Sequence, residues 1–347
     1  MPLPSLATFA VALAGGLLFF ELSLPVPWLL GPLAGVMLLS VSRPAAVRWP
    51  ACYRDAGLVA IGYLMGRPFT AEVGRQIMAQ LPAMLTMTGA VVLFSLLVGY
   101  ITHRRTGLTL ATAVLATVPG GLSQMVVLGE EIAGADVAVI TFMQTIRLLS
   151  VVFCVPFITI HGFAPVAASA VAAAADAGAA PLFLAAVLFG AWLAVRVHLP
   201  APFMLGPTLI TAGLVFSGWP APPLPPVLLI AAQISVGAFM GTNMNAASLR
   251  ACRRLLGHTI LNAAAIVLFS LFAGFLLAEF SQASQATAFL AAAPGGIAEM
   301  GLTALLLGAD VSVVLAYQMF RLLSILLVLP FFLRWWLGPS KADPDSC

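Results

Sequence analysis

The chain has 347 residues, of which 62% are hydrophobic and only 8% are charged. A soluble globular domain carries roughly 25% charged residues, so this composition excludes a chain whose main solvent is water. The four cysteines and four histidines lack the spacing of a metal site or a disulfide framework. The net charge of +3 suits contact with anionic lipid headgroups better than contact with nucleic acid. We therefore expect an all-α integral membrane protein without a metal or cofactor.

The first half offers four candidate spanning helices, then two short apolar pieces and one long helix. A span needs about 20 apolar residues to cross roughly 30 Å of hydrocarbon. The first segment has neither a basic leader region nor a small-residue cleavage site, so we interpret it as a retained helix. In chain order the segments are 6–20, 28–41, 57–69, 79–100, 107–118, 121–129 and 137–160.

The second half repeats the first, 175 residues further along the chain. Its segments are 181–195, 203–216, 227–240, 259–278, 287–293, 296–307 and 311–336. Three motifs recur: 24–32 as 199–207, 119–125 as 294–300 and, after a one-residue deletion, 144–150 as 318–324. The predicted organisation is membrane repeat 1 over 1–162, an alanine-rich linker over 163–180, membrane repeat 2 over 181–336 and a cytoplasmic tail over 337–347.

The short pieces decide the topology. Twelve helical residues rise about 18 Å, so neither piece crosses the membrane alone. The Pro-Gly-Gly between them breaks the helix, which leaves either one broken span or a re-entrant hairpin. Basic residues favour opposite sets of loops in the two halves, which requires an odd number of spans per repeat. We expect two inverted-topology repeats, each with about five spanning helices and one re-entrant hairpin, in a cell inner membrane with both termini cytoplasmic.

One arginine lies near the middle of the last long segment of each repeat. Arg147 and Arg321 each follow an aspartate, Asp136 or Asp310, by eleven residues, which corresponds to about 16 Å of helix and places them near the bilayer centre. An arginine there costs at least about 2.5 kcal/mol, so it requires a partner or a watery cavity. One interpretation gives the arginines a substrate-binding or gating role. In the other, each caps the carbonyl groups of a neighbouring hairpin and fixes the fold.

The hairpin tips are further candidates for substrate binding. A half-helix that begins at the midplane points unpaired N–H groups and a positive dipole end into a cavity, and glycine admits a ligand closely. Packing between the hairpins is the alternative. Gln144 and Gln318, three residues before the arginines, are predicted to bind a ligand or to bond the opposite hairpin. The tip residues are Pro119, Gly120, Gly121, Pro294, Gly295 and Gly296.

Other positions carry more specific expectations. Gln124 of the first hairpin is Glu299 in the second, and a buried carboxylate there would be a salt-bridge partner or a group that couples transport to protons or sodium. Asp136 and Asp310 are predicted N-caps. Two pairs of glycines at small-xxx-small spacing are predicted to bring helices close together; they are Gly62, Gly66, Gly237 and Gly241.

The duplicated motifs resemble those of a known family. The Pro-Gly-Gly segments at 119–125 and 294–300, the Gln-x-x-Arg segments and the Leu-Pro-x-Pro segments are similar to those of the AbrB-duplication membrane proteins of bacteria. Members often carry the labels ammonia monooxygenase or AbrB family transcriptional regulator, and one is associated with regulation of gene expression. The resemblance implies a bacterial inner-membrane protein, and it supplies no site residues.

The residues argue against both labels as direct activities. An oxygenase needs clustered histidine or carboxylate ligands at the membrane centre, and a DNA-binding regulator needs a soluble basic module. We expect no enzyme, but a secondary transporter or permease for a small anionic solute, with Glu299 as coupling group. The alternative is a membrane-borne sensor that affects gene expression indirectly. The expected partners are the solute and the lipid bilayer, without direct contact with nucleic acid. The sequence is compatible with a homo-oligomer.

Overall fold

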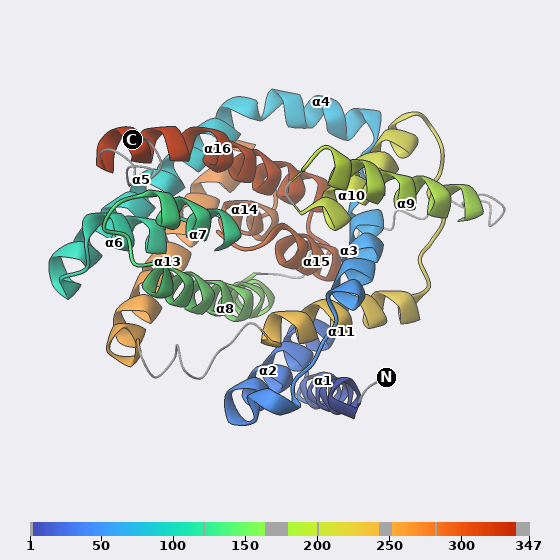
Figure 1. Ribbon diagram of the computed structural model, residues 1–347. Helices are drawn as coiled ribbons and strands as arrows, with labels where there is room; N and C mark the ends of the chain where they lie inside the picture. The colour runs from blue at the N-terminus through green and yellow to red at the C-terminus, as the bar shows by residue number, and fades with distance from the viewer. Residues whose placement is uncertain are drawn as a thin grey trace, which may run out of the picture. The chain divides into compact units, whose positions relative to one another are not determined.

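The computed structural model describes residues 3–120, 122–163, 180–199, 201–242, 252–281 and 283–337. Helices make up the secondary structure of these ranges, without a β-strand among them (Figure 1). Residues 164–179, most of the predicted linker, and 338–347, most of the predicted tail, lie outside the described residues. The all-α prediction is therefore confirmed for the described part of the chain.

The helices follow the duplicated pattern of the sequence. In the first half they are α1 (Leu3–Glu21), α2 (Pro27–Ser42), α3 (Ala51–Gly66), α4 (Ala71–Ala79), α5 (Leu81–Thr106), α6 (Leu110–Thr117), α7 (Leu122–Glu131) and α8 (Val137–Gly162). In the second half they are α9 (Ala180–Arg196), α10 (Pro202–Phe216), α11 (Pro226–Thr242), α13 (Leu256–Ser281), α14 (Gln285–Ala292), α15 (Ile297–Leu307) and α16 (Val311–Leu337).

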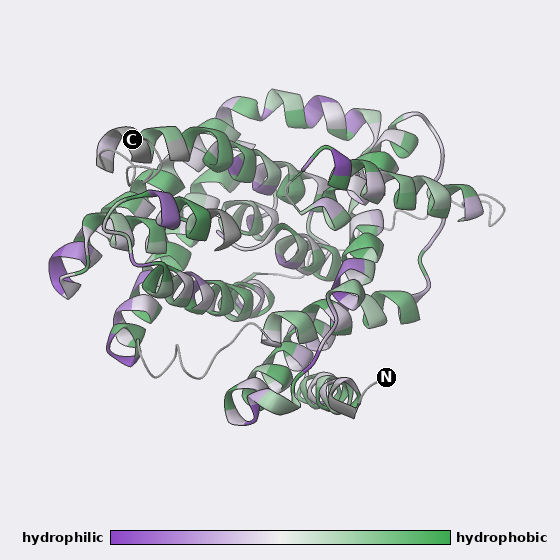
Figure 2. Cartoon of the chain, viewed as in Figure 1, coloured by the Kyte–Doolittle hydropathy of each residue, from purple (hydrophilic) through white to green (hydrophobic). Residues whose placement is uncertain are grey.

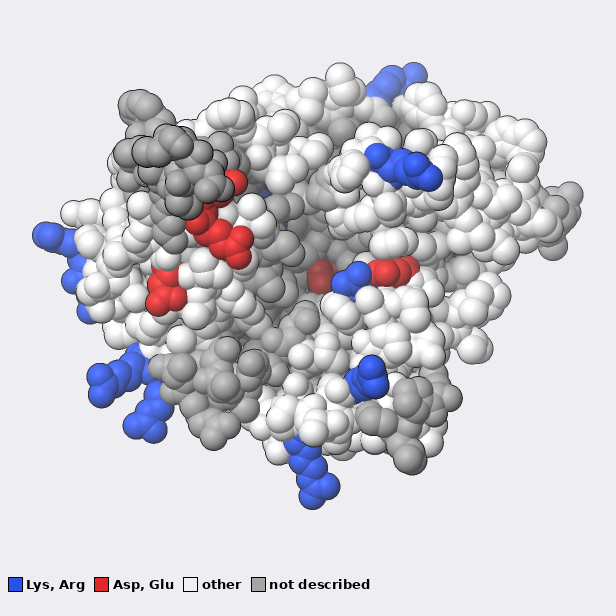
Figure 3. All heavy atoms as spheres, viewed as in Figure 1, with Lys and Arg blue, Asp and Glu red and all other residues white. Residues whose placement is uncertain are grey.

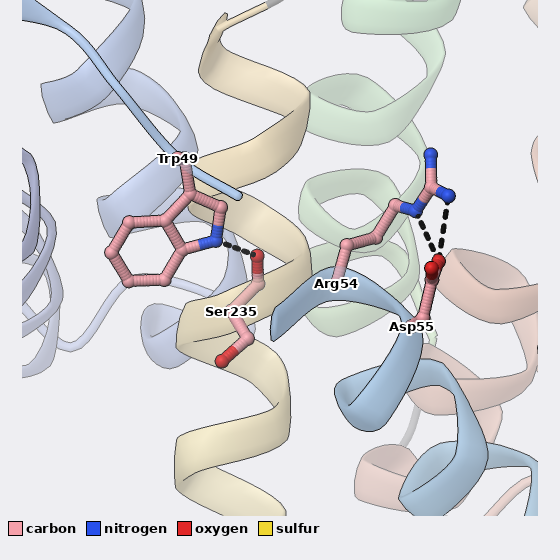
Figure 4. A network of polar contacts seen from close by, with 4 residues as sticks. All are labelled: Trp49, Arg54, Asp55 and Ser235. Carbon is pink, nitrogen blue, oxygen red and sulfur yellow. Dashed lines mark hydrogen bonds and ion pairs between the residues drawn. The ribbon is translucent and has the colours of Figure 1, made fainter. Parts of the chain in front are cut away.

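Two features of the first half differ from the predicted segments. Helix α4 was missed, because its nine residues include an exposed ion pair between Glu72 and Arg75 and form no apolar run. Helix α3 begins at Ala51, six residues before the predicted start. Its first turns contain Arg54 and Asp55, whose side chains pair at 2.6 Å (Figure 4), so the two charges are tolerated within the helix.

Within the described ranges, four helical segments are long and apolar enough to cross a membrane: Leu81–Thr106, Val137–Gly162, Arg253–Ser281 and Val311–Val328. Apolar residues dominate the helices (Figure 2), and neutral residues cover most of the face drawn in Figure 3. Leu93 on α5 and its repeat equivalent Leu268 on α13 are 68% and 62% exposed. Exposed apolar side chains on long apolar helices suit a lipid solvent, so the architecture is that of an all-α membrane protein.

The residues form two compact units, and each unit draws on both halves of the sequence. Unit 1 comprises Met1–Ala79, Pro156–Ala246 and Ala298–Leu315, and unit 2 comprises Gln80–Val155, Ala247–Ile297 and Ala316–Cys347. The first three helices of each half therefore belong to unit 1, whereas the long helices α5 and α13 and the short helices α6 and α14 belong to unit 2. The units are described separately below.

Unit 1 is held together by glycines at helix crossings. A Cβ atom on Gly237 of α11 would lie 2.2 Å from the carbonyl oxygen of Leu29 on α2. In the same way, a Cβ on Gly62 of α3 would lie 2.4 Å from the carbonyl oxygen of Met204 on α10. Gly241 and Gly66, one turn further on, make equivalent approaches to α2 and α10. The third helix of each half thus packs against the second helix of the other half, and the predicted role of these glycines in close packing is confirmed.

Polar contacts also join the two halves within unit 1. Trp49, which precedes α3, donates a hydrogen bond from Nε1 to the carbonyl oxygen of Ser235 on α11, at 3.1 Å (Figure 4). The guanidinium of Arg54 lies 4.3 Å from the ring centroid of Phe239 on α11, a distance suited to a cation–π interaction. The start of α3 is therefore anchored to α11 by both of these contacts.

The Leu-Pro-x-Pro motif determines how α2 and α10 begin. Val26 and Ala201, which precede the helices, both have φ of 47°, in the left-handed region. Pro27 and Pro202 then occupy the first helical position, where the missing N–H group costs no hydrogen bond. The same strained entry recurs in both halves, so the motif specifies a local structure. The later prolines Pro32 and Pro207 lie inside these helices.

Unit 2 is organised around α5 and α13. Phe94 on α5 stacks on its repeat equivalent Phe269 on α13, with ring centroids 4.1 Å apart and an interplanar angle of 5°. Eight residues further along α5, Thr102 accepts a hydrogen bond at 2.9 Å from Asn262, which lies seven residues earlier on α13. A later residue of one helix thus meets an earlier residue of the other, so the two equivalent helices run antiparallel.

Each of the long helices α5 and α13 also packs against the short helix that follows it in its own half. A Cβ atom on Gly99 of α5 would lie 3.1 Å from the Cα of Val114 on α6. A Cβ on Gly274 of α13 would lie 2.7 Å from the Cα of Phe289 on α14. The two glycines occupy equivalent positions in the repeats, so the same close contact seats both short helices.

Candidate functional site

The two short helices of unit 2 have matching ends. Helix α6 begins after Thr109, whose side chain accepts the N–H of Thr112, and helix α14 begins after Ser284, whose side chain accepts the N–H of Thr287. Both N–H groups lie 3.2 Å from the capping oxygen. Each helix has eight residues, which correspond to about 12 Å of rise and cannot cross a bilayer.

The helices end at the Pro-Gly-Gly tips in the same conformation. The C-cap of α6 is Val118, with φ −64° and ψ 132°, and that of α14 is Ala293, with φ −62° and ψ 133°. An extended residue leaves the last carbonyl groups of a helix without intrahelical donors. The tips therefore expose several main-chain carbonyl groups that need hydrogen-bond donors from neighbouring side chains.

Gln144 and Gln318 supply donors to these acceptors. The Nε2 group of Gln144, on α8, donates to the carbonyl oxygens of Leu115 and Val118 at 2.6 and 2.9 Å. That of Gln318, on α16, donates to Leu290 and Ala293 at 2.8 and 2.9 Å. Both glutamines are 1% exposed. They cap the short helix of their own repeat, so the alternative in which they bond the opposite hairpin is wrong.

The arginines complete the same caps. Nη1 of Arg147 donates to the carbonyl oxygen of Val118 at 3.1 Å, and Nη1 of Arg321 donates to that of Ala292 at 3.1 Å. The side chains are 7% and 6% exposed. One N–H of each guanidinium thus has the capping role that the sequence left as an alternative. The other N–H groups of each arginine are not committed to these carbonyls.

The two buried arginines bring positive charge into the interior of unit 2. The two guanidinium groups lie near enough for the charge of Arg147 to repel that of Arg321. Within the described residues of unit 2, neither arginine forms a salt bridge with an aspartate or glutamate. A buried charge is expensive unless it is paired. Two such charges with only neutral carbonyl partners therefore make a centre that favours an anion.

The two caps differ in two respects. Arg321 bonds the carbonyl group of Ala292, one residue before the equivalent of Val118, and only one of the arginines bonds its glutamine. In repeat 2, Nη2 of Arg321 donates to Oε1 of Gln318. In repeat 1, Nε of Arg147 and Oε1 of Gln144 are both buried and have no hydrogen-bond partner among the described residues. In repeat 2 the arginine and glutamine of the Gln-x-x-Arg segment are thus bonded to each other, which we call the closed pair. In repeat 1 they are not, which we call the open pair.

The tip residues differ in their surroundings. Pro119 and Gly120 are buried, and a Cβ atom on Gly120 would lie 2.3 Å from Cε of Met125. Pro294 is buried, whereas Gly295 and Gly296 are partly exposed. Gly121 lies outside the described residues. Met125 therefore covers the described part of the first tip.

Glu299 is the acidic residue of the second predicted hairpin. It lies in the first turn of α15, and its residue range belongs to unit 1. The side chain is 9% exposed. A buried carboxylate in an apolar helix is uncommon and is a candidate functional group on that ground; its predicted coupling role stays a prediction.

Asp136 and Asp310 are N-caps, as predicted. Oδ1 of Asp136 accepts the N–H groups of Ala138 at 2.9 Å and Val139 at 3.1 Å. Oδ1 of Asp310 accepts those of Ser312 at 3.0 Å and Val313 at 3.1 Å. The aspartates thus determine where α8 and α16 begin. Across the described residues, no group of three or more His, Cys, Asp or Glu side chains is suited to hold a metal ion.

The main-chain acceptors of the site were not identified from the sequence. They are the carbonyl groups of Leu115, Val118, Leu290, Ala292 and Ala293. Every residue has a carbonyl group, so no residue type identifies which ones become acceptors. The usable signal was indirect, because a helix end before Pro-Gly-Gly must expose carbonyl groups that need donors.

Comparison with known proteins agrees with the duplicated motifs. A family model described as "Transition state regulatory protein AbrB" matches residues 28–337. The "Uncharacterized protein YhjN" of Bacillus subtilis (strain 168) is 27% identical, with 94% of this chain and 91% of that protein covered. The "Putative regulator AbrB" of Escherichia coli (strain K12) is 26% identical, with 91% and 92% covered. No solved structure matches. The chain thus belongs to the AbrB family.

Proposed function

We propose that this protein is a secondary transporter or permease for a small anionic solute, bound in unit 2 beside Arg147 and Arg321. The observation that carries the proposal is the pair of buried guanidinium groups. Each is bonded to one carbonyl group at the end of a short helix, and neither pairs with a carboxylate among the residues that the structure describes. A solute anion supplies the negative charge that this centre lacks.

The capping contacts are compatible with a binding role. One donor of each guanidinium fixes the group at the end of a short helix, which pre-organises it. A guanidinium has five N–H donors, so several are left for an oxyanion. The N-terminus of α7, the second short helix of the first hairpin, lies in unit 2 and adds a positive dipole end near the first tip. In this proposal Pro119, Gly120, Gly121, Pro294, Gly295 and Gly296 form the tips at the bilayer midplane.

The arrangement of the long helices supports the inverted-repeat part of the proposal. The equivalent helices α5 and α13 run antiparallel, as two repeats of opposite orientation require. Helices α6 and α14 are too short to span, as re-entrant hairpins require. We propose five spans and one hairpin per repeat in a cell inner membrane, with both termini cytoplasmic; this arrangement is typical of secondary transporters.

Glu299 is proposed as the coupling group. A buried carboxylate changes its charge when it binds a proton or a monovalent cation, and such a change alters the balance of charge inside a membrane protein. The equivalent residue of repeat 1 is the neutral Gln124, so only one of the two hairpins carries this group. Glu299→Gln is expected to preserve solute binding and to abolish its dependence on pH or sodium.

A membrane-borne sensor or regulator is the second candidate, favoured by the name of the relative from Escherichia coli. A sensor would bind the solute at the same arginines. It would signal this binding to a partner protein without transporting the solute across the membrane. Neither candidate requires an enzymatic reaction or direct contact with nucleic acid.

The test combines binding and flux on the full chain. Ligand binding to detergent-purified protein is measured by thermal unfolding, since a ligand at 100 times its Kd stabilises the folded state by about 2.7 kcal/mol. Arg147→Gln and Arg321→Gln are expected to reduce this stabilisation, and Arg104→Gln, an exposed position at the end of α5, is the control. Uptake into proteoliposomes separates the transporter from the sensor. If folded arginine variants keep both binding and uptake, the central anion site is wrong.

A further inference from the structure

The Gln-x-x-Arg segments of the two repeats occupy different hydrogen-bonded states in one structure. On α16, Arg321 donates to the carbonyl oxygen of Ala292 and to Oε1 of Gln318. On α8, Arg147 donates to the carbonyl oxygen of Val118, but it makes no bond to Oε1 of Gln144. The glutamines and arginines occupy equivalent positions, and the two glutamines bond equivalent carbonyl groups. The arginines differ in conformation: Arg147 bonds Val118, whereas Arg321 bonds Ala292, one residue before the equivalent of Val118, and only Arg321 bonds its glutamine.

The open pair leaves one donor and one acceptor unused. Nε of Arg147 is a donor and Oε1 of Gln144 is an acceptor, and neither has a partner among the described residues. The side chains are 7% and 1% exposed, so bulk water does not readily replace the missing partners. Leaving buried polar groups unpaired is unfavourable. They are three residues apart on one helix, and therefore lie on the same face.

The unused atoms have opposite requirements. The Nε–H group of a guanidinium needs an acceptor and favours an anionic oxygen. An amide oxygen needs a donor, which a fully deprotonated carboxylate or sulfate does not have. A small oxyanion that satisfies both atoms must carry a hydrogen-bond donor besides its anionic oxygen, and an O–H group supplies such a donor.

We propose that Arg147 and Gln144 form the primary solute contact, and that they select a small oxyanion that also carries a hydroxyl donor. Arg321 is held by Gln318 and acts as a nearby positive charge and not as the principal ligand. This inference rests on the proposed function, because it names the solute class and the contact residues of the same site. It covers two sources of one chemistry: a 2-hydroxycarboxylate and a phosphate that keeps an O–H group.

Matched probes separate these requirements on the full-length protein. Glycolate and acetate differ by one hydroxyl at equal charge, and monohydrogen phosphate and sulfate, both dianions, differ by one O–H group. Binding is measured by titration calorimetry in detergent. We expect the hydroxyl-bearing member of at least one pair to bind roughly tenfold more tightly, as one buried hydrogen bond predicts. The pair that shows the preference identifies the solute as a carboxylate or a phosphate.

Charge-conserving variants test the assignment to one arginine. Arg147→Lys keeps a cation that can still donate to the carbonyl group of Val118, but it loses the Nε–H group. It should weaken binding of the preferred probe roughly tenfold or more, whereas Arg321→Lys weakens it at most roughly threefold. Arg104→Lys is the control for loss of a guanidinium elsewhere. Gln144→Leu should abolish the preference for the hydroxyl, and Gln318→Leu should preserve it.

The outcomes distinguish this inference from the proposed function. Equal losses for the two lysine variants, or equal affinities within both probe pairs, overturn the inference while anion binding stands. Failure of every oxyanion to bind the unmodified protein overturns both. If Gln144→Leu does not fold, the probe pairs on the unmodified protein and the lysine variants still decide the matter.

Discussion

Both compact units pack helices closely at glycines, but unit 2 also relies on polar caps inside the apolar protein. In unit 1, backbones approach each other through glycines such as Gly62 and Gly237. In unit 2, the ends of short helices are satisfied by side chains that carry charge or an amide, Arg147 and Gln144 among them. Apolar burial drives association weakly in lipid, so close contact and internal hydrogen bonds stabilise the fold. Close glycine crossings leave no space for a solute, whereas spare polar groups can bind one.

The glycine crossings should be the most sensitive positions. Gly237→Val would place a Cβ atom 2.2 Å from the carbonyl oxygen of Leu29, and the helices must separate to accommodate it. We expect a loss of about 3 kcal/mol or more of unfolding free energy, at the upper end of overpacking costs, measured by thermal unfolding in detergent.

Gly213→Ala is the matched control, because a Cβ atom at Gly213 of α10 has nothing within 4 Å. Alanine favours a helix over glycine by roughly 0.5–1 kcal/mol, so this variant should be at least as stable as the unmodified chain. A stable Gly237→Val protein would show that the crossing is loose, and the contrast between the units would fail.

The glutamine caps of unit 2 should have an intermediate effect. Gln144→Leu removes the Nε2 donor from the carbonyl oxygens of Leu115 and Val118. An unsatisfied buried acceptor costs roughly 1–3 kcal/mol, and Gln318→Leu is expected to cost a similar amount. Gln233→Leu on α11 in unit 1 is the comparison. If it destabilises the protein as much as the caps do, the special role of capping in unit 2 is refuted.

The smallest predicted effect is at the aspartate N-caps. Asp136→Ala removes the acceptor for the N–H groups of Ala138 and Val139 and should cost about 1 kcal/mol. Asp136→Asn keeps an acceptor oxygen and should retain most of the stability, which thermal unfolding of the two variants would compare. Equal destabilisation by alanine and asparagine would indicate that the negative charge, and not the cap, stabilises the start of α8.

The sequence predicted most of the helices and part of the site. The apolar segments correspond to helices α1–α3, α5–α11 and α13–α16, because length and hydropathy are local properties. Helix α4 was not predicted, because its nine amphipathic residues form no apolar run. Arg147 and Arg321 were identified because a charge inside an apolar helix is conspicuous. The carbonyl groups that hold them were not, because every residue offers the same acceptor.

By itself, the sequence determined that the chain is duplicated, helical and too apolar for water, and that each half contains a broken pair of short helices with an arginine in the next long one. Only the tertiary structure decided that the glutamine and arginine cap the short helix of their own repeat. It also decided that the third helix of each half packs on the second helix of the other. The physical reason is that sequence pattern specifies which groups need partners, whereas packing specifies which of many chemically identical partners they meet.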